Sequence, residues 1–252
     1  MNEMSKLEVD SSQTLLSRLT FNPTFRLPET RVVLTWLAMV VGLFLRIVEF
    51  TDNRQLYLDE RLLLENLTDL PVWDLHTVLK NDQLAPPGFL VLERVMVRLP
   101  LPIIPTARLI PFLAAIATMF YFPRVAKRYL DPRAVPLATG LFALGDYSIY
   151  YASEIKQYSV ETALALMALG LAAWAEEACD LAERQRRLLI LSAFGVIGVW
   201  FSLPLIFSLA GVGLAFFLSR LRCRDWIRVA TWTGIGTVWL LSFGGCYFVC
   251  DR

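Results

Sequence analysis

Long apolar runs with few charges inside them constrain this chain more than any other feature of its sequence. The first run, 32–50, has about the ~20 residues that an α-helix needs to cross the hydrocarbon core of a bilayer. Further runs lie at 109–122, 134–149, 160–175, 188–202, 205–218 and 227–249. Hydrophobic residues make up 56% of the chain and the mean hydropathy is +0.51, which is more apolar than a soluble domain of this size. We therefore predict an all-α, polytopic transmembrane bundle with about seven spanning helices.

The charges between these runs predict an orientation. Residues 124–133, 184–187 and 220–228 are basic connections, and the positive-inside rule places them in the cytoplasm together with the N-terminal tail, 1–31. No cleavable signal pattern precedes the first run, so we expect that run to target and anchor an integral, multi-pass protein. Residues 32–252 would form one membrane module.

Residues 51–106 form the predicted outer loop. In its first part, 51–87, acidic side chains outnumber basic ones, which suits the non-cytoplasmic face. Residues 61–67 have the pattern of an amphipathic helix lying on the membrane. The apolar stretch 89–104 either spans or lies embedded, and the charge count favours an embedded helix on the outer face.

Overall charge and cysteine content point to no further partner class. The formal net charge is +1, so we expect membrane lipid and no nucleic acid as a partner. The four cysteines have no metal-ligand spacing with a histidine, because His76 is the one histidine of the chain.

Two adjacent carboxylates, Asp59 and Glu60, follow the first apolar run by a few residues. At a membrane surface such a pair can act as a general base, or bind a divalent cation that stabilises a phosphate leaving group. The alternative is a solvated loop or a helix N-terminus, where acids interact favourably with the helix dipole.

A second polar stretch carries aromatic and acidic side chains at helical spacing: Tyr147, Tyr151, Glu154, Tyr158 and Glu161. If this region were helical, the five would form one stripe, suited to binding a sugar. Tyrosines are also the ordinary residues of a membrane interface, which is the alternative interpretation.

Arg108 and Lys156 are the candidates for binding a phosphate on the outer face, the first through a fork of donors and the second as a point charge. Glu161 begins an apolar run, where an unpaired acid is costly. Either cation is a candidate partner for it.

Four segments, in this order, resemble motifs of the GT-C superfamily of membrane glycosyltransferases: 56–60, 83–90, 107–111 and 150–159. The first is similar to the outer-loop acidic motif after the first helix, and the second to a Pro-Pro motif before an apolar helix. The third is similar to an Arg-Leu-Pro helix start, and the fourth to a Tyr-Ser-x-Glu motif. The resemblance extends over residues 32–220. The superfamily includes the protein O-mannosyltransferase and aminoarabinose-transferase-like families.

The resemblance implies an inverting transfer of a sugar from a polyprenyl-phosphate donor to an acceptor. Asp59 would be the general base, assisted by Glu60, and Glu154 the second acid of the site. In metal-dependent relatives Asp59 and Glu154 would bind Mg²⁺ or Mn²⁺. Arg108 and Lys156 would bind the donor phosphate. The substrate would also contact Tyr151 and Tyr158 of the fourth motif, and Glu161 just after it.

The chain departs from the family in two respects. Ala85 stands where relatives often have a histidine or a basic residue before the Pro-Pro pair, and relatives usually run to about twice this length. A second chain that supplies further C-terminal helices is one expectation. The alternatives are a non-catalytic subunit that binds polyprenyl-phosphate lipid, or a transporter in which Arg46 and Glu161 line a pathway.

Overall fold

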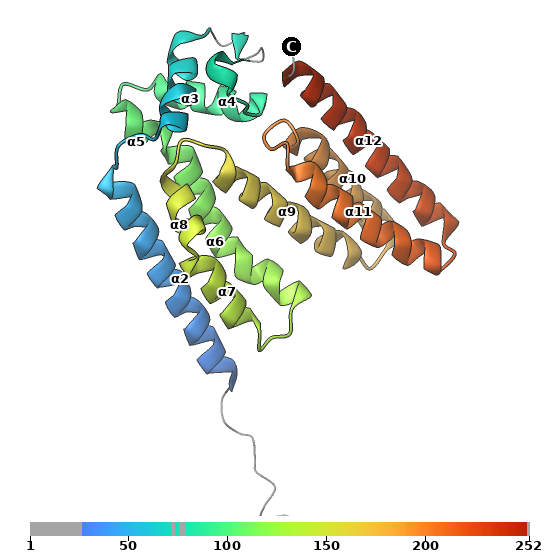
Figure 1. Ribbon diagram of the computed structural model, residues 1–252. Helices are drawn as coiled ribbons and strands as arrows, with labels where there is room; N and C mark the ends of the chain where they lie inside the picture. The colour runs from blue at the N-terminus through green and yellow to red at the C-terminus, as the bar shows by residue number, and fades with distance from the viewer. Residues whose placement is uncertain (1–26, 72–73, 76–78, 251–252) are drawn as a thin grey trace, which may run out of the picture.

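The computed structural model describes residues 27–71, 74–75 and 79–250, and the part of the chain that it describes is helical without any strand (Figure 1). Most of the predicted tail, 1–26, and His76 lie outside these residues. The elements are α2 (Leu27–Asp52), α3 (Leu58–Asp69), η2 (Lys80–Asp82), α4 (Pro87–Val97), α5 (Ile103–Ala107), α6 (Leu109–Tyr129), α7 (Val135–Leu144), α8 (Asp146–Tyr150), η3 (Tyr151–Ser153), α9 (Tyr158–Glu176), α10 (Leu181–Gly198), α11 (Leu205–Arg222) and α12 (Trp226–Cys250).

Five of the described helices are long and apolar enough to cross a membrane: residues Thr30–Asp52 of α2, and α6, α9, α11 and α12. Their length and composition indicate a multi-pass membrane protein, and the all-α prediction is confirmed. The predicted number of about seven spanning helices is not confirmed.

Two predicted spans differ for local reasons. The run 134–149 is interrupted at Gly145, whose backbone is extended (φ −63°, ψ 126°), so α7 has 10 residues and reaches ~15 Å of the ~30 Å needed. The run 188–202 forms the second part of α10, whose first part is highly charged, and that helix ends at Gly198. The sequence patterns overestimated the length of both apolar helices.

Helices α3, α4 and α5 gather at one end of the long helices, above α2 and α6 in Figure 1. The three connections between α6 and α7, α9 and α10, and α11 and α12 lie at the opposite end. Basic residues cluster at this end in the last turns of α6 and α11 and in the first turns of α10, although the connection between α9 and α10, residues 177–180, carries none.

Close helix contacts organise the N-terminal part of the bundle. At Gly42 of α2 an added Cβ would lie 2.7 Å from the carbonyl oxygen of Ala143 in α7, and at Gly170 of α9 it would overlap Tyr121 of α6. These positions exclude larger side chains because the neighbouring helices already occupy the space.

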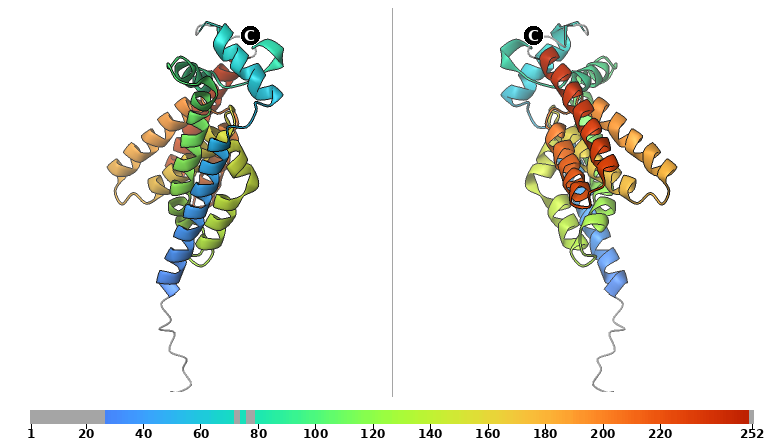
Figure 2. Two further views of the ribbon diagram at one scale, coloured as in Figure 1. Left: turned by 90° about the vertical axis from the view of Figure 1, so that its left-hand side faces the viewer. Right: turned by 90° about the vertical axis from the view of Figure 1, so that its right-hand side faces the viewer.

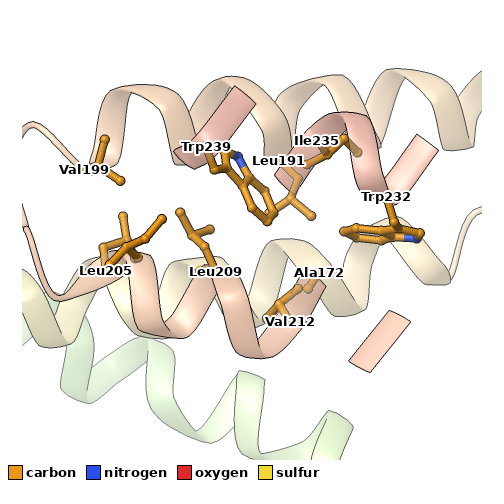
Figure 3. Packing of buried hydrophobic residues seen from close by; sticks show 11 residues of the cluster. Ala172, Leu191, Val199, Leu205, Leu209, Val212, Trp232, Ile235 and Trp239 are labelled. Carbon is orange, nitrogen blue, oxygen red and sulfur yellow. The ribbon is translucent and has the colours of Figure 1, made fainter. Parts of the chain in front are cut away.

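Helices α10, α11 and α12 pack against one another beside the rest of the bundle (Figure 2). Their shared core is apolar and includes Trp232 and Trp239 from α12, with Leu205 and Leu209 from α11 (Figure 3). The Trp239 indole is 2% exposed, and its Nε1 donates to the Ser192 carbonyl oxygen at 3.1 Å.

The segment Pro86-Pro87-Gly88 contacts the connection between α10 and α11. Pro87 occupies the first turn of α4, where its missing N–H costs no helical hydrogen bond. The Gly88 amide donates to the carbonyl oxygen of Trp200 at 2.8 Å, and an added Cβ would lie 2.8 Å from that same oxygen. Only glycine therefore allows α4 to approach the connection between α10 and α11 this closely.

Candidate functional site

The Glu60 carboxylate is the centre of the polar cluster at the α3 end of the bundle. Glu60 is the third residue of α3, and its Oε2 accepts the backbone N–H of Tyr57 at 3.1 Å, which completes a capping box. Its backbone position and its side chain therefore both fix the start of α3.

Three further segments bind the same carboxylate. Arg108 Nη2 donates to Oε1 and Oε2 at 3.2 and 3.3 Å, Arg54 Nη1 donates to Oε2 at 3.1 Å, and the Ile155 amide donates to Oε1 at 3.0 Å. Glu60 and Arg108 are each 0% exposed. A buried charge is tolerated when it is paired and hydrogen-bonded, so Glu60 holds together the loops that sequence analysis predicted to meet.

Arg54 adds a second layer to this cluster. Its guanidinium carbon lies 5.0 Å from the ring centre of Tyr57 and 4.3 Å from that of Tyr150, within the range of cation–π interactions. Its carbonyl oxygen accepts a hydrogen bond from Arg108 Nη1 at 3.1 Å. Sequence analysis treated Arg54 only as one of the charges of the outer loop. The sequence feature that could have indicated its cation–π contact is Tyr57, three residues later.

Asp59 differs sharply from its neighbour. Its side chain is exposed and makes no hydrogen bond or ion pair to any described residue. It lies close enough to Glu154 for its charge to raise the pKa of that carboxyl group. Of the adjacent pair, Glu60 is buried and bound by the surrounding segments, whereas Asp59 is exposed.

Glu154 lies at the other side of the site. It is 7% exposed, and its Oε2 has no hydrogen-bond partner among the described residues. Burial, followed by the charge of Glu60, raises the pKa of Glu154, while Arg54 and Lys156 oppose the shift. The environment therefore favours the protonated carboxyl more than an exposed site would.

Lys156 is buried beside Glu154 and donates from Nζ to Gln83 Oε1 at 2.8 Å. This contact links the second outer loop to the segment before the Pro-Pro pair. Because the acceptor is a neutral amide, the ammonium charge has no direct ion pair among the described residues. Arg108 is instead occupied by Glu60.

The aromatic side chains gather although they do not lie on one helix. The chain turns through η3 and the extended residue Glu154 between α8 and α9, so the continuous helix needed for one stripe is absent. The rings of Tyr147 and Tyr151 are nevertheless 6.0 Å apart, and those of Tyr151 and Tyr158 are 4.7 Å apart. Tyr147 is 73% exposed, which leaves an aromatic surface open beside the acids.

A cavity of about 160 Å³ lies beneath this aromatic surface. Tyr151, Tyr158, Ser159 and Arg46 are among the residues that line it. Arg46 is 1% exposed, and its Nη1 donates to the carbonyl oxygens of Gly42 and Ala143 at 2.9 and 2.7 Å.

The position of Arg46 follows from the break after α7. Helix α7 ends at Leu144, which leaves its last carbonyl groups without helical partners, and Arg46 binds them. Its Nε has no hydrogen-bond partner among the described residues. An arginine inside an apolar run was the sequence signal for this site.

Glu161 does not pair with either predicted cation. Lys156 and Arg108 bind Gln83 and Glu60 instead, whereas the backbone N–H of Glu161 donates to the carbonyl oxygen of Gln157 at 2.8 Å. Glu161 therefore lies near the site without an ion pair to a described residue.

The residues present suit a cation only in part. Within the described ranges there is no cluster of three or more His, Cys, Asp or Glu side chains that could hold a metal. Asp59 and Glu154 would supply two carboxylates. Mg²⁺ is often held by one or two carboxylates together with substrate phosphates, so these two residues fit a cation that arrives with its substrate.

No family model matches the chain, and comparisons with curated proteins and with solved structures gave no significant match. The class therefore follows from the fold and the site: an all-α, multi-pass membrane protein with acids, tyrosines and a lysine gathered at one end of its helices.

Proposed function

We propose that this protein is a membrane glycosyltransferase that moves a sugar from a polyprenyl-phosphate donor to an acceptor at the outer face. The observation that carries the proposal is the exposed Asp59 beside the buried Glu154 and the open tyrosine surface. These groups come from loops about 95 residues apart that Glu60 joins. Free carboxylates next to aromatic rings suit the binding and deprotonation of a sugar or its acceptor.

In the proposed reaction Asp59 accepts the proton of the acceptor hydroxyl. The acceptor oxygen forms a bond to the anomeric carbon while the bond from that carbon to the phosphate oxygen breaks. Polyprenyl phosphate leaves with the bonding electron pair, and the anomeric configuration is inverted. Glu154, whose pKa is raised, holds a proton near the leaving phosphate.

Lys156 is the better of the two predicted phosphate ligands. Its ammonium group makes its described hydrogen bond to a neutral amide, so a phosphate can take that place and neutralise the charge. Arg108 is committed to Glu60 and acts by positioning the loops. The tyrosine rings would bind the sugar face.

We also propose a GT-C-like topology with seven crossings and a cytoplasmic N-terminus. Helices α7 and α8 together, and α10 with the connection that follows it, would complete two crossings that are too short as single apolar helices. The alternation of helix direction in Figure 1 and the basic connections at one end support this topology. Further C-terminal helices from a second chain would complete the acceptor site.

The test is turnover of a panel of polyprenyl-phosphate sugars by the full chain in lipid bilayers, with wild type compared with Asp59→Asn. We expect sugar transfer, or slow sugar release to water, to fall at least ~100-fold in the variant, which is the usual range for a lost general base. Donor binding should persist. Asp52→Asn is the matched control, because Asp52 is also exposed and lies at the end of α2.

Two outcomes would redirect the proposal. Donor binding without turnover by wild type would identify a non-catalytic subunit that binds polyprenyl-phosphate lipid. Neither binding nor turnover would reject the glycosyltransferase proposal for this chain.

A further inference from the structure

A second feature lies at the opposite end of α2 from the candidate site. A groove of about 650 Å³ runs between α2 and α7, with Leu34 on one side and Leu137 and Leu141 on the other. Leu137 is 68% exposed and Leu141 is 69% exposed, so the groove opens to the surroundings of the bundle. In a membrane protein this surface faces lipid.

Two arginines stand at one end of this groove. Arg31 belongs to the first turns of α2, and Arg133 lies in the connection between α6 and α7. Neither guanidinium forms an ion pair within the described part of the chain. The acid nearest to Arg133 in sequence, Asp131, uses its carboxylate to accept the backbone N–H of Arg133 at 2.7 Å.

The floor of the groove is open at Gly140. A Cβ built at Gly140 would meet no atom within 4 Å, in contrast to Gly42, where the same two helices are in tight contact. The lining extends along α7 from Pro136 to Leu144, which is ~12 Å at the helical rise per residue. An apolar chain, not a folded segment, fits this shape.

We propose that the groove binds one anionic phospholipid, with its phosphate between Arg31 and Arg133 and an acyl chain along Gly140. Guanidinium groups bind phosphate through paired, charge-assisted hydrogen bonds. Basic pockets between helices near the basic face of a membrane protein suit lipid headgroups. This site does not depend on the proposed transferase activity, because it shares no residue with the outer cluster.

The experiment measures lipid that stays bound to the full chain. Protein is equilibrated in bilayers of equimolar phosphatidylcholine and phosphatidylglycerol, extracted in mild detergent and washed, and the retained lipids are quantified per chain by mass spectrometry. We expect wild type to retain phosphatidylglycerol in preference to phosphatidylcholine. In the double variant Arg31→Gln/Arg133→Gln this preference should be about 30-fold smaller, which corresponds to ~1 kcal/mol of binding free energy for each basic residue removed.

The matched charge control is Lys127→Gln/Arg222→Gln, which removes two exposed positive charges at the same end of the bundle. It should retain the lipid like wild type. To test the chain position, Gly140→Leu adds a side chain where a Cβ would meet no atom within 4 Å, and Gly236→Leu, at an equally open glycine of α12, is its control. Gly140→Leu should lower retention, whereas Gly236→Leu should not.

Three results would overturn the proposal. Equal loss in the two charge variants would show that only the general basic surface attracts lipid. Unchanged retention in Gly140→Leu would show that no acyl chain occupies the groove. Equal retention of the two phospholipids by wild type would remove the headgroup assignment.

Discussion

The α3 end of the bundle and the C-terminal unit of α10, α11 and α12 are built from different interactions. At the α3 end, Glu60, Arg108 and Arg54 are largely or fully buried and join four segments through hydrogen bonds and ion pairs. In the C-terminal unit the core is apolar, and Trp239 is the centre of the packing (Figure 3). One region is specified by charge pairing and the other by shape.

The two kinds of packing leave different groups available for binding a polar ligand. In the apolar unit every buried group packs, so little is left to bind a polar ligand. At the α3 end the charges that hold the loops together leave Asp59 and Glu154 unpaired beside them. Buried charge pairs can cost as much as they contribute, so their value here is the geometry that they impose on the site.

The largest expected effect comes from breaking the charge cluster. Glu60→Gln removes the carboxylate and leaves Arg108 buried without its ion pair, which typically costs on the order of 3–5 kcal/mol. Thermal unfolding of the purified protein in detergent measures this loss. Asp59→Asn, one residue away but exposed, should melt within a degree or two of wild type. Equal melting of Glu60→Gln and wild type would contradict the central role of Glu60.

A second prediction concerns the uncompensated acid at the α3 end. Glu93 of α4 is 0% exposed, both of its carboxylate oxygens lack hydrogen-bond partners among the described residues, and burial raises its pKa to about 9. Because the folded pKa exceeds the ordinary glutamate value of 4.5, the folded state binds more protons between these values, and stability falls as pH rises from 4.5 towards 9.

Glu93→Gln should remove this pH dependence. From pH 5 to pH 8 the ideal loss for wild type is ~4 kcal/mol, at about 1.4 kcal/mol for each pKa unit, and relaxation reduces it to on the order of 2 kcal/mol. Melting temperatures of wild type and variant should agree near pH 5 and diverge by several degrees near pH 8. Glu65→Gln, at an exposed position of α3, is the control, and parallel pH profiles would contradict the prediction.

A smaller effect is expected in the apolar unit. Trp239→Phe keeps an aromatic ring but loses the hydrogen bond to Ser192, so we expect about 1 kcal/mol of destabilisation. Trp226→Phe, 65% exposed at the start of the same helix, should leave the melting temperature unchanged. The Trp239 effect should also be independent of salt and pH. A salt-dependent loss would show that charges contribute to this core as well.

The helical class of the fold could be predicted from sequence because hydropathy is a local property. The five longest apolar helices lie where the runs predicted them. The end of α7 could not be placed in the same way. Gly145-Asp146 lies inside an apolar window, and whether a glycine there continues or ends a helix depends on what binds the last carbonyls, here Arg46 from a helix about 100 residues away.

The candidate site could be predicted only in part, because the roles of its residues depend on contacts with distant segments. The adjacent acids marked the right loop, but their separate roles depend on burial. Neighbouring residues of a helix point in different directions, so Glu60 enters the cluster while Asp59 faces outward. The ion pair between Arg108 and Glu60 could not be predicted from sequence either. The two residues are 48 positions apart, and each motif taken alone is equally compatible with ligand binding.

The smallest expected effect concerns two ion pairs of similar length that differ in exposure. Lys80 and Asp69 form an ion pair of 3.2 Å, nearly the same length as the 3.1 Å pair of Arg54 with Glu60, but their side chains are 53% and 56% exposed. Exposed pairs contribute a few tenths of a kcal/mol because water and salt screen them.

Asp69→Asn should therefore shift the melting temperature by a degree or less, and the shift should vanish in high salt. If this variant were as destabilised as Glu60→Gln, ion-pair distance and not burial would determine stability at the α3 end. A large difference between the two variants would instead attribute the strength of the Glu60 cluster to exclusion of water, the same property that raises the pKa of Glu154 beside it.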